Sequence, residues 1–312
     1  MKLTHFREGK HNSQADPFLI LGNDGYFYMY VTGGDGVVAF RSDSLTGEYE
    51  DLGVVFSSSD GKEYWAPSVI YTHGKYYMYV SFMQKGDTDV HLQTMHSAVS
   101  DYPYGPFTDC GKLIEPFSID SHVVENENGI FIFYSSNDYE AERAGTYILV
   151  DRLLSPTKAS GNPVAVVRPT IDEEIFARDR FRKGQHWHTL EGAFYFRKND
   201  WHYLIYSGNC YESPYYYLGY AVANTEETDL TKIKFRKQPD ENTYLPLISK
   251  NDFEEGTGHN SVIYYQGEYY CVYHGRDVVP DDRIKGDKRT ARICRLSVDN
   301  GVIKAFRYQD QL

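Results

Sequence analysis

Long hydrophobic runs and closely spaced cysteines are both missing from this 312-residue sequence. No stretch approaches the roughly 18 apolar residues of a membrane-spanning helix, and the N-terminal MKLTHFREGKHNSQ has no apolar core of the kind a secretory signal needs. Cys110, Cys210, Cys271 and Cys294 form no C-x-x-C pair, which argues against a zinc site or a disulfide framework. We therefore expect a cytoplasmic protein that does not bind membranes.

Positive charge is also in short supply. The 32 Lys and Arg residues are outnumbered by 44 Asp and Glu residues, which gives a formal net charge of -12, and the cations are scattered along the chain. Such a molecule repels a phosphate backbone, so we expect no nucleic-acid partner. The sequence is compatible with a homo-oligomer but contains no feature that specifies one.

Aromatic residues, in contrast, are abundant. They make up 16% of the chain and include 29 tyrosines. A tyrosine packs as a ring and still presents a hydroxyl, so this bias suits β-sheets and surfaces that bind sugars. The length is normal for a single large β architecture with a full core.

A motif made of two aromatic or β-branched runs occurs five times. The copies are DPFLILGNDGYFYMY, APSVIYTHGKYYMY, DSHVVENENGIFIFY, EGAFYFRKNDWHYLIY and HNSVIYYQGEYYCVY, and each ends in tyrosine. A polar turn separates the two runs of each copy, which predicts a β-hairpin. The five predicted hairpins cover residues 16–30, 66–79, 120–134, 191–206 and 259–273.

A looser pair of strands follows each hairpin, so each unit has four strands. Successive hairpins begin 50 to 71 residues apart. Four-stranded repeats of this kind are typical of propeller blades. We predict an all-β protein in which residues 1–312 form a single five-bladed β-propeller with four-stranded antiparallel blades. Residues 3–6 are expected to complete the last blade, and the insertion at residues 170–189 is expected to hold at most two turns of helix around Ile175 and Phe176.

The first residues of the five hairpins include three acids. In order they are Asp16, Ala66, Asp120, Glu191 and His259. The innermost strands of a propeller line its axis, so equivalent positions converge on one cavity. Taken singly, an Asp before Pro or a Glu before Gly is a common turn residue. Three acids held together cost repulsion and desolvation, however, so their agreement across the repeats favours a functional site.

The motifs ADPF, WAPSV, SIDSHVVENENG, LEGAFYF and GTGHNSV resemble, in order, the blade motifs of glycoside hydrolase family 43. The resemblance implies an enzyme that removes arabinose or xylose from plant-wall glycans with inversion of configuration. It implies that Asp16 is the general base, that Glu191 is the general acid, and that Asp120 raises the pKa of Glu191 and orients it. Among family members, the compact chain looks most like exo-acting α-L-arabinofuranosidases.

The chemistry of inversion fits this division of roles. One carboxylate activates a water on one face of the sugar, and a protonated carboxyl on the other face donates to the leaving oxygen, with the two groups about 6.5 to 9.5 Å apart. Opposite walls of a propeller channel can supply such a gap. A negative charge at Asp120 would keep Glu191 protonated near neutral pH.

Three further residues are candidates for substrate contacts. Trp65 suits the wall of a sugar subsite, with core packing as the alternative. His259 matches a family histidine near the axis, so the resemblance implies a structural Ca2+ that His259 contacts through water. Arg292 resembles a family arginine that pairs with the acids or with sugar hydroxyls, with an ordinary strand arginine as the alternative. The reaction itself requires no cofactor.

Three functions remain open from the sequence. We expect an inverting α-L-arabinofuranosidase that releases terminal residues from arabino-oligosaccharides. A β-xylosidase acting on xylo-oligosaccharides is the first alternative, because the two sugars present similar hydroxyls. A non-catalytic carbohydrate-binding propeller is the second, since a fold alone does not establish activity.

Overall fold

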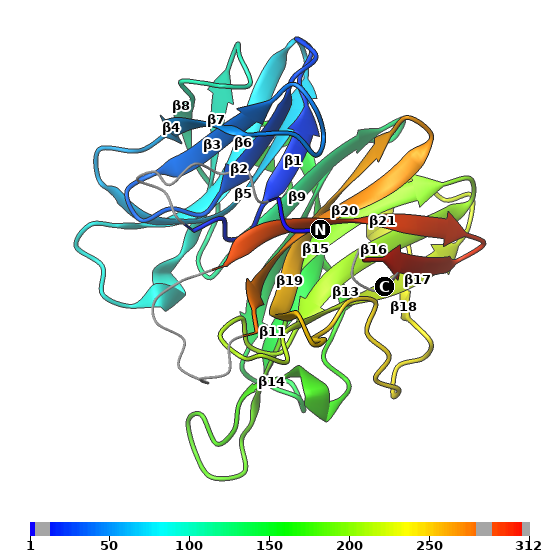
Figure 1. Ribbon diagram of the computed structural model, residues 1–312. Helices are drawn as coiled ribbons and strands as arrows, with labels where there is room; N and C mark the ends of the chain where they lie inside the picture. The colour runs from blue at the N-terminus through cyan, green and yellow to red at the C-terminus, as the bar shows by residue number, and fades with distance from the viewer. Residues whose placement is uncertain (4–12, 279–288, 308–312) are drawn as a thin grey trace.

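The computed structural model describes residues 1–3, 13–278 and 289–307, which fold almost entirely into β-strands (Figure 1). The helical segments of these residues are three single turns of 3-10 helix: η1 (Val90–Leu92), η2 (Asp172–Glu174) and η3 (Leu230–Lys232). None of the described helices is long and apolar enough to cross a membrane.

The strands form five antiparallel blades in chain order. The first blade contains β1 (Phe18–Leu21), β2 (Phe27–Val31), β3 (Val37–Ser42) and β4 (Glu50–Phe56), and the second contains β5 (Gly61–Thr72), β6 (Lys75–Gln84), β7 (Thr94–Ser100) and β8 (Thr108–Ile114). The third contains β9 (Ile119–Asn126), β10 (Gly129–Asp138) and β11 (Gly145–Ser155), with β12 (Lys158–Ala159) and β13 (Val164–Val167) along the outer edge of β11. The fourth contains β15 (Trp187–Lys198), β16 (Trp201–Gly208), β17 (Tyr217–Asn224) and β18 (Arg236–Lys237), and the fifth contains β19 (Glu254–Tyr265), β20 (Glu268–Asp277), β21 (Thr290–Asp299) and β22 (Val302–Phe306).

The first strand of each blade lies on the inside of a closed ring. β1 contacts β5, β5 contacts β9, β9 contacts β15, β15 contacts β19, and β19 contacts β1. Blades three and four are joined further by a short parallel pairing of β11 with β15. The five-bladed β-propeller that the repeat predicts is therefore confirmed.

The N-terminal segment adds to the last blade. Lys2 forms an antiparallel bridge with Arg292 of β21, on the side opposite β20, and the N–H of Leu3 donates to the carbonyl of Ala291 over 3.0 Å. The Leu3 side chain is buried in a cluster that includes Val272 and Ile293. Residues 1–3 thus complete blade five as expected, and residues 4–6 of that expectation lie outside the described residues.

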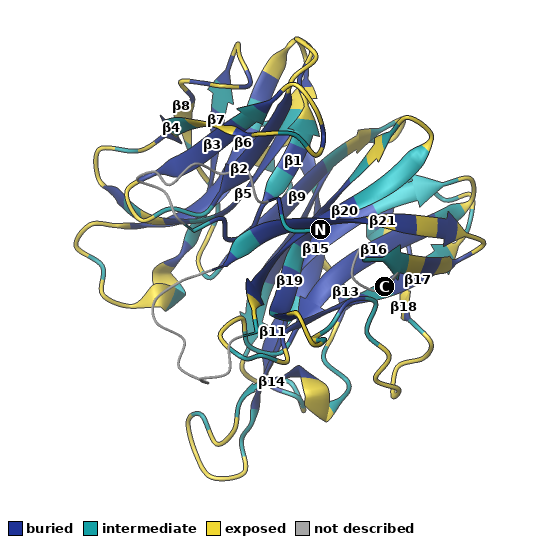
Figure 2. Cartoon of the chain, viewed as in Figure 1, coloured by how far each residue is buried: buried dark blue, intermediate teal, exposed yellow. Residues whose placement is uncertain are grey.

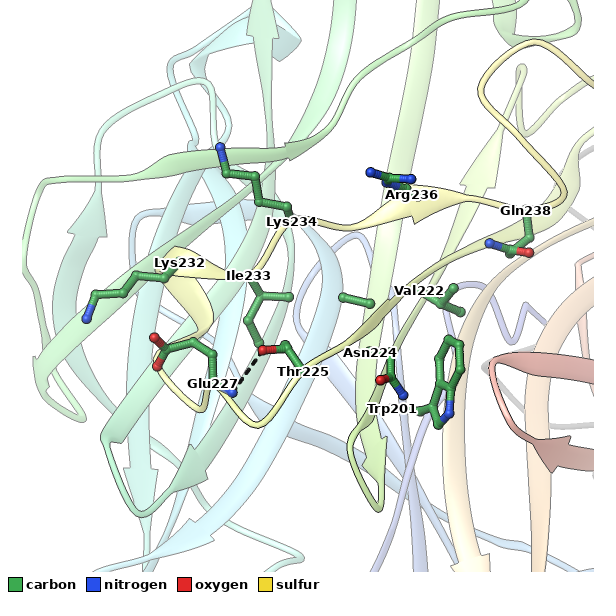
Figure 3. Close-up of a pocket in the computed structure, with 11 residues that line it drawn as sticks. Trp201, Val222, Asn224, Thr225, Glu227, Lys232, Ile233, Lys234, Arg236 and Gln238 are labelled. Carbon is green, nitrogen blue, oxygen red and sulfur yellow. Dashed lines mark hydrogen bonds between the residues drawn. The ribbon is translucent and has the colours of Figure 1, made fainter.

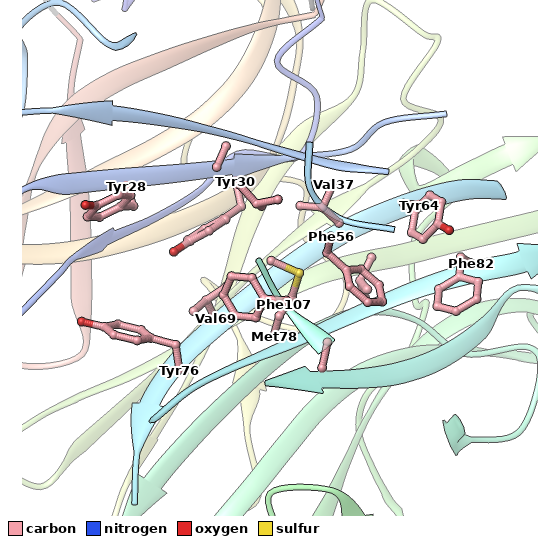
Figure 4. Close-up of a cluster of buried hydrophobic side chains, with 14 residues drawn as sticks. Tyr28, Tyr30, Val37, Phe56, Tyr64, Val69, Tyr76, Met78, Phe82 and Phe107 are labelled. Carbon is pink, nitrogen blue, oxygen red and sulfur yellow. The ribbon is translucent and has the colours of Figure 1, made fainter. Parts of the chain in front are cut away.

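The core fills the space between neighbouring blades. A cluster between blades one and two contains Tyr28, Tyr30, Phe56, Tyr64 and Phe82 (Figure 4). The hydroxyl of Tyr30 donates to the carbonyl of Pro103 over 2.6 Å, so the buried tyrosine is also satisfied. The inner strands are largely buried and the connecting loops are exposed (Figure 2). This packing explains the many tyrosines, because their rings fill the space between sheets and their hydroxyls bond to the backbone.

The insertion at residues 170–189 contains less helix than expected. Ile175 and Phe176 belong to a short strand, β14 (Ile175–Ala177), which pairs with β15, and the single turn η2 precedes them. The expected helix around these two residues is wrong, because a β-branched and an aromatic residue here extend a sheet edge. The base of the insertion is anchored by the buried Glu174, whose Oε1 lies 2.6 Å from Nζ of Lys237.

Candidate active site

Every blade has a residue with a positive φ at one equivalent position, in its inner strand or just before it. These residues are Asp16 (55°), Ala66 (46°), Asp120 (59°), Gly192 (61°) and His259 (49°). In blades two to five, the pairing of the two inner strands is irregular beside this position. A left-handed residue at a bulge re-aims the side chains around it. Here the bends bring Asp16, Asp120 and His259 to the wall of one cavity.

Blade four departs from the predicted register by one residue. Gly192 occupies the bent position, so Glu191 precedes it and is not equivalent to Asp16 and Asp120. A Cβ at position 192 would lie 3.1 Å from Nδ1 of His259, and its φ is +61°. Glycine therefore permits both the bend and the close approach of the histidine ring.

All three predicted acids line a single axial cavity of about 940 Å³. Trp65 and His259 line the same cavity, and Trp65 is only half-buried, so part of its ring faces this space. The volume lies within the range of about 300–1,000 Å³ that is usual for small-molecule sites. Five of the six predicted site residues thus come together here.

The electrostatic surroundings of Asp16 favour its ionised form. The hydroxyl of Thr32 donates to Oδ2 over 2.6 Å, and Oδ1 lies 3.3 Å from Nη1 of Arg289 and 3.4 Å from Nδ1 of His259. Burial is the largest single influence and would raise the pKa of Asp16, but Arg289, His259 and His274 together hold that pKa well below its usual range. Asp16 is therefore a carboxylate throughout the neutral pH range.

His274 fixes the backbone of Asp16. The N–H of Asp16 donates to Nδ1 of His274 over 3.2 Å, and the same nitrogen lies 3.2 Å from Oδ1 of Asp16. Burial lowers the pKa of His274 to about 4, and the ring is accordingly neutral at pH 7. His274 was not among the residues predicted from the sequence, although it directly follows the tyrosine that ends the fifth motif.

Glu191 lies in the opposite electrostatic environment. Burial raises the pKa of Glu191 to about 7; the hydrogen bond from Tyr216 opposes the rise and the charge of Asp16 adds to it. The hydroxyl of Tyr216 donates to Oε1 over 2.8 Å. A carboxyl with this pKa both holds a proton near neutral pH and can release it, which is the property of a general acid.

Asp120 titrates together with Glu191. Burial, followed by repulsion from Glu191 and Asp16, raises the pKa of Asp120 well above its usual range. Two buried carboxyls that repel each other share a proton and titrate as a pair, so a charge on either favours the proton on the other. The pKa of Glu191 is raised, but its causes are burial and the charge of Asp16, whereas the sequence led us to expect Asp120 as the cause.

Tyr216, which precedes β17, is a second site residue that the sequence analysis missed. Its fully buried ring stacks on His274 with centroids 5.6 Å apart. A Cβ at Gly258 would lie 1.9 Å from this ring, so the glycine before His259 makes room for it. No sequence signal separates Tyr216 from the other tyrosines, because its role depends on contacts with Glu191 and His274, which are distant from it in the sequence.

The predicted substrate contact of Arg292 is wrong. Its guanidinium is buried, 3.1 Å from Oε2 of Glu254 and 2.7 Å from Oδ1 of Asp277, and it does not line the axial cavity. The alternative of a structural strand arginine applies instead. Arg289, directly before β21, lines the cavity and lies beside Asp16.

The expected calcium ion stays a prediction. Among the described residues, no group of three or more His, Cys, Asp or Glu side chains could hold a metal ion. Calcium takes roughly six to eight oxygen ligands, whereas Nδ1 of His259 lies 3.4 Å from an oxygen of Asp16 and 3.9 Å from one of Asp120. These side chains alone supply too few oxygen ligands for a calcium ion.

A second cavity, of about 570 Å³, lies at the outer edge of blade four (Figure 3). Lys232 and Lys234 extend away from each other rather than toward a shared ligand position. Glu227 is the one acid among the described residues that line this cavity, and its Oε1 accepts from the N–H groups of Thr228 and Asp229. The acid–base chemistry is therefore concentrated in the axial cavity.

A propeller whose axis gathers an ionised carboxylate, a carboxyl of raised pKa and a third acid in one sugar-sized cavity defines a glycosidase. The model of the family described as "Glycosyl hydrolases family 43" matches residues 10–303, and the chain belongs to this family. The resemblance on which the site prediction was based is thereby confirmed.

Individual relatives agree with this assignment. A "Xylosidase/arabinosidase" from Bacteroides ovatus is 25% identical over 289 residues, which cover 82% of this chain and 78% of the relative. An "Extracellular exo-alpha-(1->5)-L-arabinofuranosidase" from Streptomyces avermitilis is 24% identical over 300 residues, covering 91% of this chain and 59% of the relative. The crystal structure of a thermostable family-43 glycoside hydrolase is 28% identical, has a TM-score of 0.76, and covers 93% of this chain and 92% of its own.

Proposed function

We propose that the protein is an inverting α-L-arabinofuranosidase that removes terminal arabinofuranosyl residues from arabino-oligosaccharides. One observation carries the proposal: Asp16 and Glu191 line one cavity, and their pKa values are shifted in opposite directions. Inversion needs one carboxylate and one protonated carboxyl at the same time, and this pair supplies both at neutral pH.

In the proposed reaction, Asp16 accepts a proton from a water molecule as the water oxygen attacks the anomeric carbon. Glu191 gives its proton to the oxygen of the leaving saccharide as the glycosidic bond breaks. The products are an inverted sugar and a shortened saccharide, with one proton gained by Asp16 and one lost by Glu191. Exchange with solvent then resets both groups.

The neighbours of the two acids have supporting roles in this proposal. Arg289 and His274 keep Asp16 ionised and oriented before water binds. Asp120 accepts from the N–H of Gly192 over 3.2 Å, beside the general acid, and because the two acids titrate together, a charge on Asp120 favours the protonated form of Glu191.

The arabinose preference rests on the exo-arabinofuranosidase similarity. A β-xylosidase is the second candidate, and the name of the Bacteroides ovatus relative, which joins both activities, favours keeping it. The two sugars expose similar hydroxyls, so the shape of the cavity decides between them.

The test compares aryl α-L-arabinofuranoside with aryl β-D-xyloside as substrates, with Asp16→Asn and Glu191→Gln as blanks. We expect faster turnover of the arabinoside, loss of turnover in both variants, and an inverted first product by proton NMR. Retention of configuration would refute the mechanism. Release of internal fragments rather than arabinose from linear arabinan would refute the exo assignment. Full turnover by Glu191→Gln would refute the role of Glu191 as the general acid.

A further inference from the structure

The insertion at residues 170–189 contributes an arginine that the proposed reaction does not use. Arg180 lines the axial cavity together with Phe176 and Trp187. Its guanidinium carbon lies 5.3 Å from the ring centroid of Phe176, 5.3 Å from that of Phe181 and 5.1 Å from that of Trp187. Three aromatic rings thus hold one guanidinium through cation–π attraction.

The rings that hold Arg180 are themselves fixed. Phe181 and Trp187 meet edge to face with centroids 5.5 Å apart, and Tyr139 packs 5.0 Å from Trp187. The N–H of Arg180 donates to the carbonyl of Gln185 over 3.1 Å, which folds the tip of the insertion back on itself. The guanidinium is therefore placed by a built support in the segment that projects beside β14 (Figure 1).

The donors of this guanidinium are unused within the part of the chain that the structure describes. Across the described residues, the Arg180 side chain has no hydrogen-bond or ion-pair partner, only the ring contacts. An arginine carries five N–H donors in a fixed fork and stays charged at any physiological pH. Such a fork at a cavity wall is suited to the hydroxyl oxygens of a saccharide.

The position of Arg180 relative to Glu191 follows from β15, the strand that carries Glu191. Trp187, Thr189 and Glu191 are alternate residues of β15, and all three line the cavity. Four strand residues span about 13 Å, so Trp187, and Arg180 over its ring, lie well away from the general acid along this wall. Asp16, the proposed base, belongs instead to blade one.

We infer that Arg180 binds the hydroxyls of the saccharide on the leaving-group side of the scissile bond. This inference rests on the proposed function, in which Glu191 protonates the leaving oxygen and the departing saccharide lies on its side of the cavity. Because Arg180 stands beyond the first sugar, a leaving group of two sugar units reaches it and a small aryl group does not.

The experiment measures the ratio of kcat/KM for 1,5-α-L-arabinotriose to kcat/KM for 4-nitrophenyl α-L-arabinofuranoside. Arg180→Met keeps an apolar side chain among the rings and removes the charge and the donors. We expect the ratio to fall about 10- to 100-fold, mainly through a higher KM for the triose, as for a lost charged hydrogen bond. Arg182→Met, the same change at an exposed residue of the same loop, is expected to keep the wild-type ratio.

An unchanged ratio in Arg180→Met, or an equal fall with Arg182→Met, would overturn the inference. Arg180→Lys retains the charge without the planar fork and is expected to restore only part of the ratio.

If the wild type cleaves xylosides instead, the same ratio is taken with xylotriose and the aryl xyloside, and Arg180 is tested separately from the arabinose assignment. If it cleaves neither, the proposed function fails, and calorimetric binding of arabinotriose to wild type and Arg180→Met decides the inference.

Discussion

At the scale of single residues, the hydroxyl of Tyr216 lowers the pH at which Glu191 loses its proton. It stabilises the carboxylate form, so it lowers a pKa that burial has raised. Tyr216→Phe removes this donor, and the pKa of Glu191 rises further. Since a general acid works only when protonated, we expect the alkaline limb of kcat/KM to move up by about one pH unit. Tyr215→Phe, at an exposed neighbour, is the control; an alkaline limb that stays or moves down in Tyr216→Phe would contradict this role.

The acidic limb depends on Arg289 in the opposite sense. Its charge helps to hold the pKa of Asp16 below the usual range, so Asp16 is active as a base at pH values above that lowered pKa. Arg289→Gln raises the pKa of Asp16, and we expect activity to fade at a higher pH on the acid side, by about one unit or more. The pH profile of kcat/KM measures this shift. Arg295→Gln, which removes an exposed arginine paired with Glu268, should leave the profile unchanged.

The residue types at equivalent repeat positions were enough to predict the three acids. The register of blade four and the other residues around the acids could be found only from the folded backbone. The offset of one residue in the fourth motif concealed that Gly192, not Glu191, takes the bent position. Arg289 and Arg292 lie on opposite sides of the beginning of β21, and only the fold shows that the first faces the cavity and the second faces Glu254. Tyr216 and His274 act through partners distant in sequence, so no local pattern marked them.

At the scale of elements, the buried pair Glu174–Lys237 holds the insertion to blade four. Glu174 also accepts from the N–H groups of Thr170 and Ile171. Lys237→Met leaves this carboxylate buried and unpaired, so we expect a loss of about 3–5 kcal/mol in the free energy of unfolding, measured in urea. Lys232→Met, at an exposed lysine whose partner Asp229 also pairs with Arg152, should change stability by about 0.5 kcal/mol or less.

A double variant tests whether the unpaired charge causes that loss. Glu174→Gln combined with Lys237→Met removes both charges and should be more stable than Lys237→Met alone. A double variant that is equally unstable or worse would show that packing, rather than the charge, is what Lys237 supplies. Because the same segment leads to Arg180, the single variant should also lower the preference for arabinotriose.

The hairpins were predictable because each is a local pattern of two runs and a turn. The insertion was not, because its strand β14 forms only by pairing with the edge of β15. Ile175 and Phe176 are compatible with either state when taken alone, and the available sheet edge decides the outcome. Long-range pairing also joins β11 to β15 in parallel, and a pattern of local hairpins cannot predict such a pairing.

At the scale of the whole molecule, the ring closes where its two ends meet, and this seam borders the active site. The N–H of Gln14 donates to the carbonyl of Arg289 over 2.9 Å, two residues from Asp16. The proposed base and the arginine that keeps it ionised therefore approach each other only in the closed ring. Because a propeller must close, the sequence could predict that the N-terminal residues join the last blade. Which of these residues pair with β21 could be found only from the structure.

Leu3 tests how much stability this closure contributes. The side chain is 2% exposed and belongs to a cluster that also contains Leu19 of blade one and Val272 and Ile293 of blade five, so it contributes to the core shared by the first and last blades. Leu3→Ala should lower the free energy of unfolding by about 2–5 kcal/mol, whereas Leu21→Ala, at a side chain 45% exposed, should have a much smaller effect. Because the seam holds Asp16 beside Arg289, activity and tryptophan fluorescence should be lost together, at a lower urea concentration than in the wild type. Activity that survives after the fluorescence transition, or equal losses in the two variants, would show that the seam does not unite the propeller with its site.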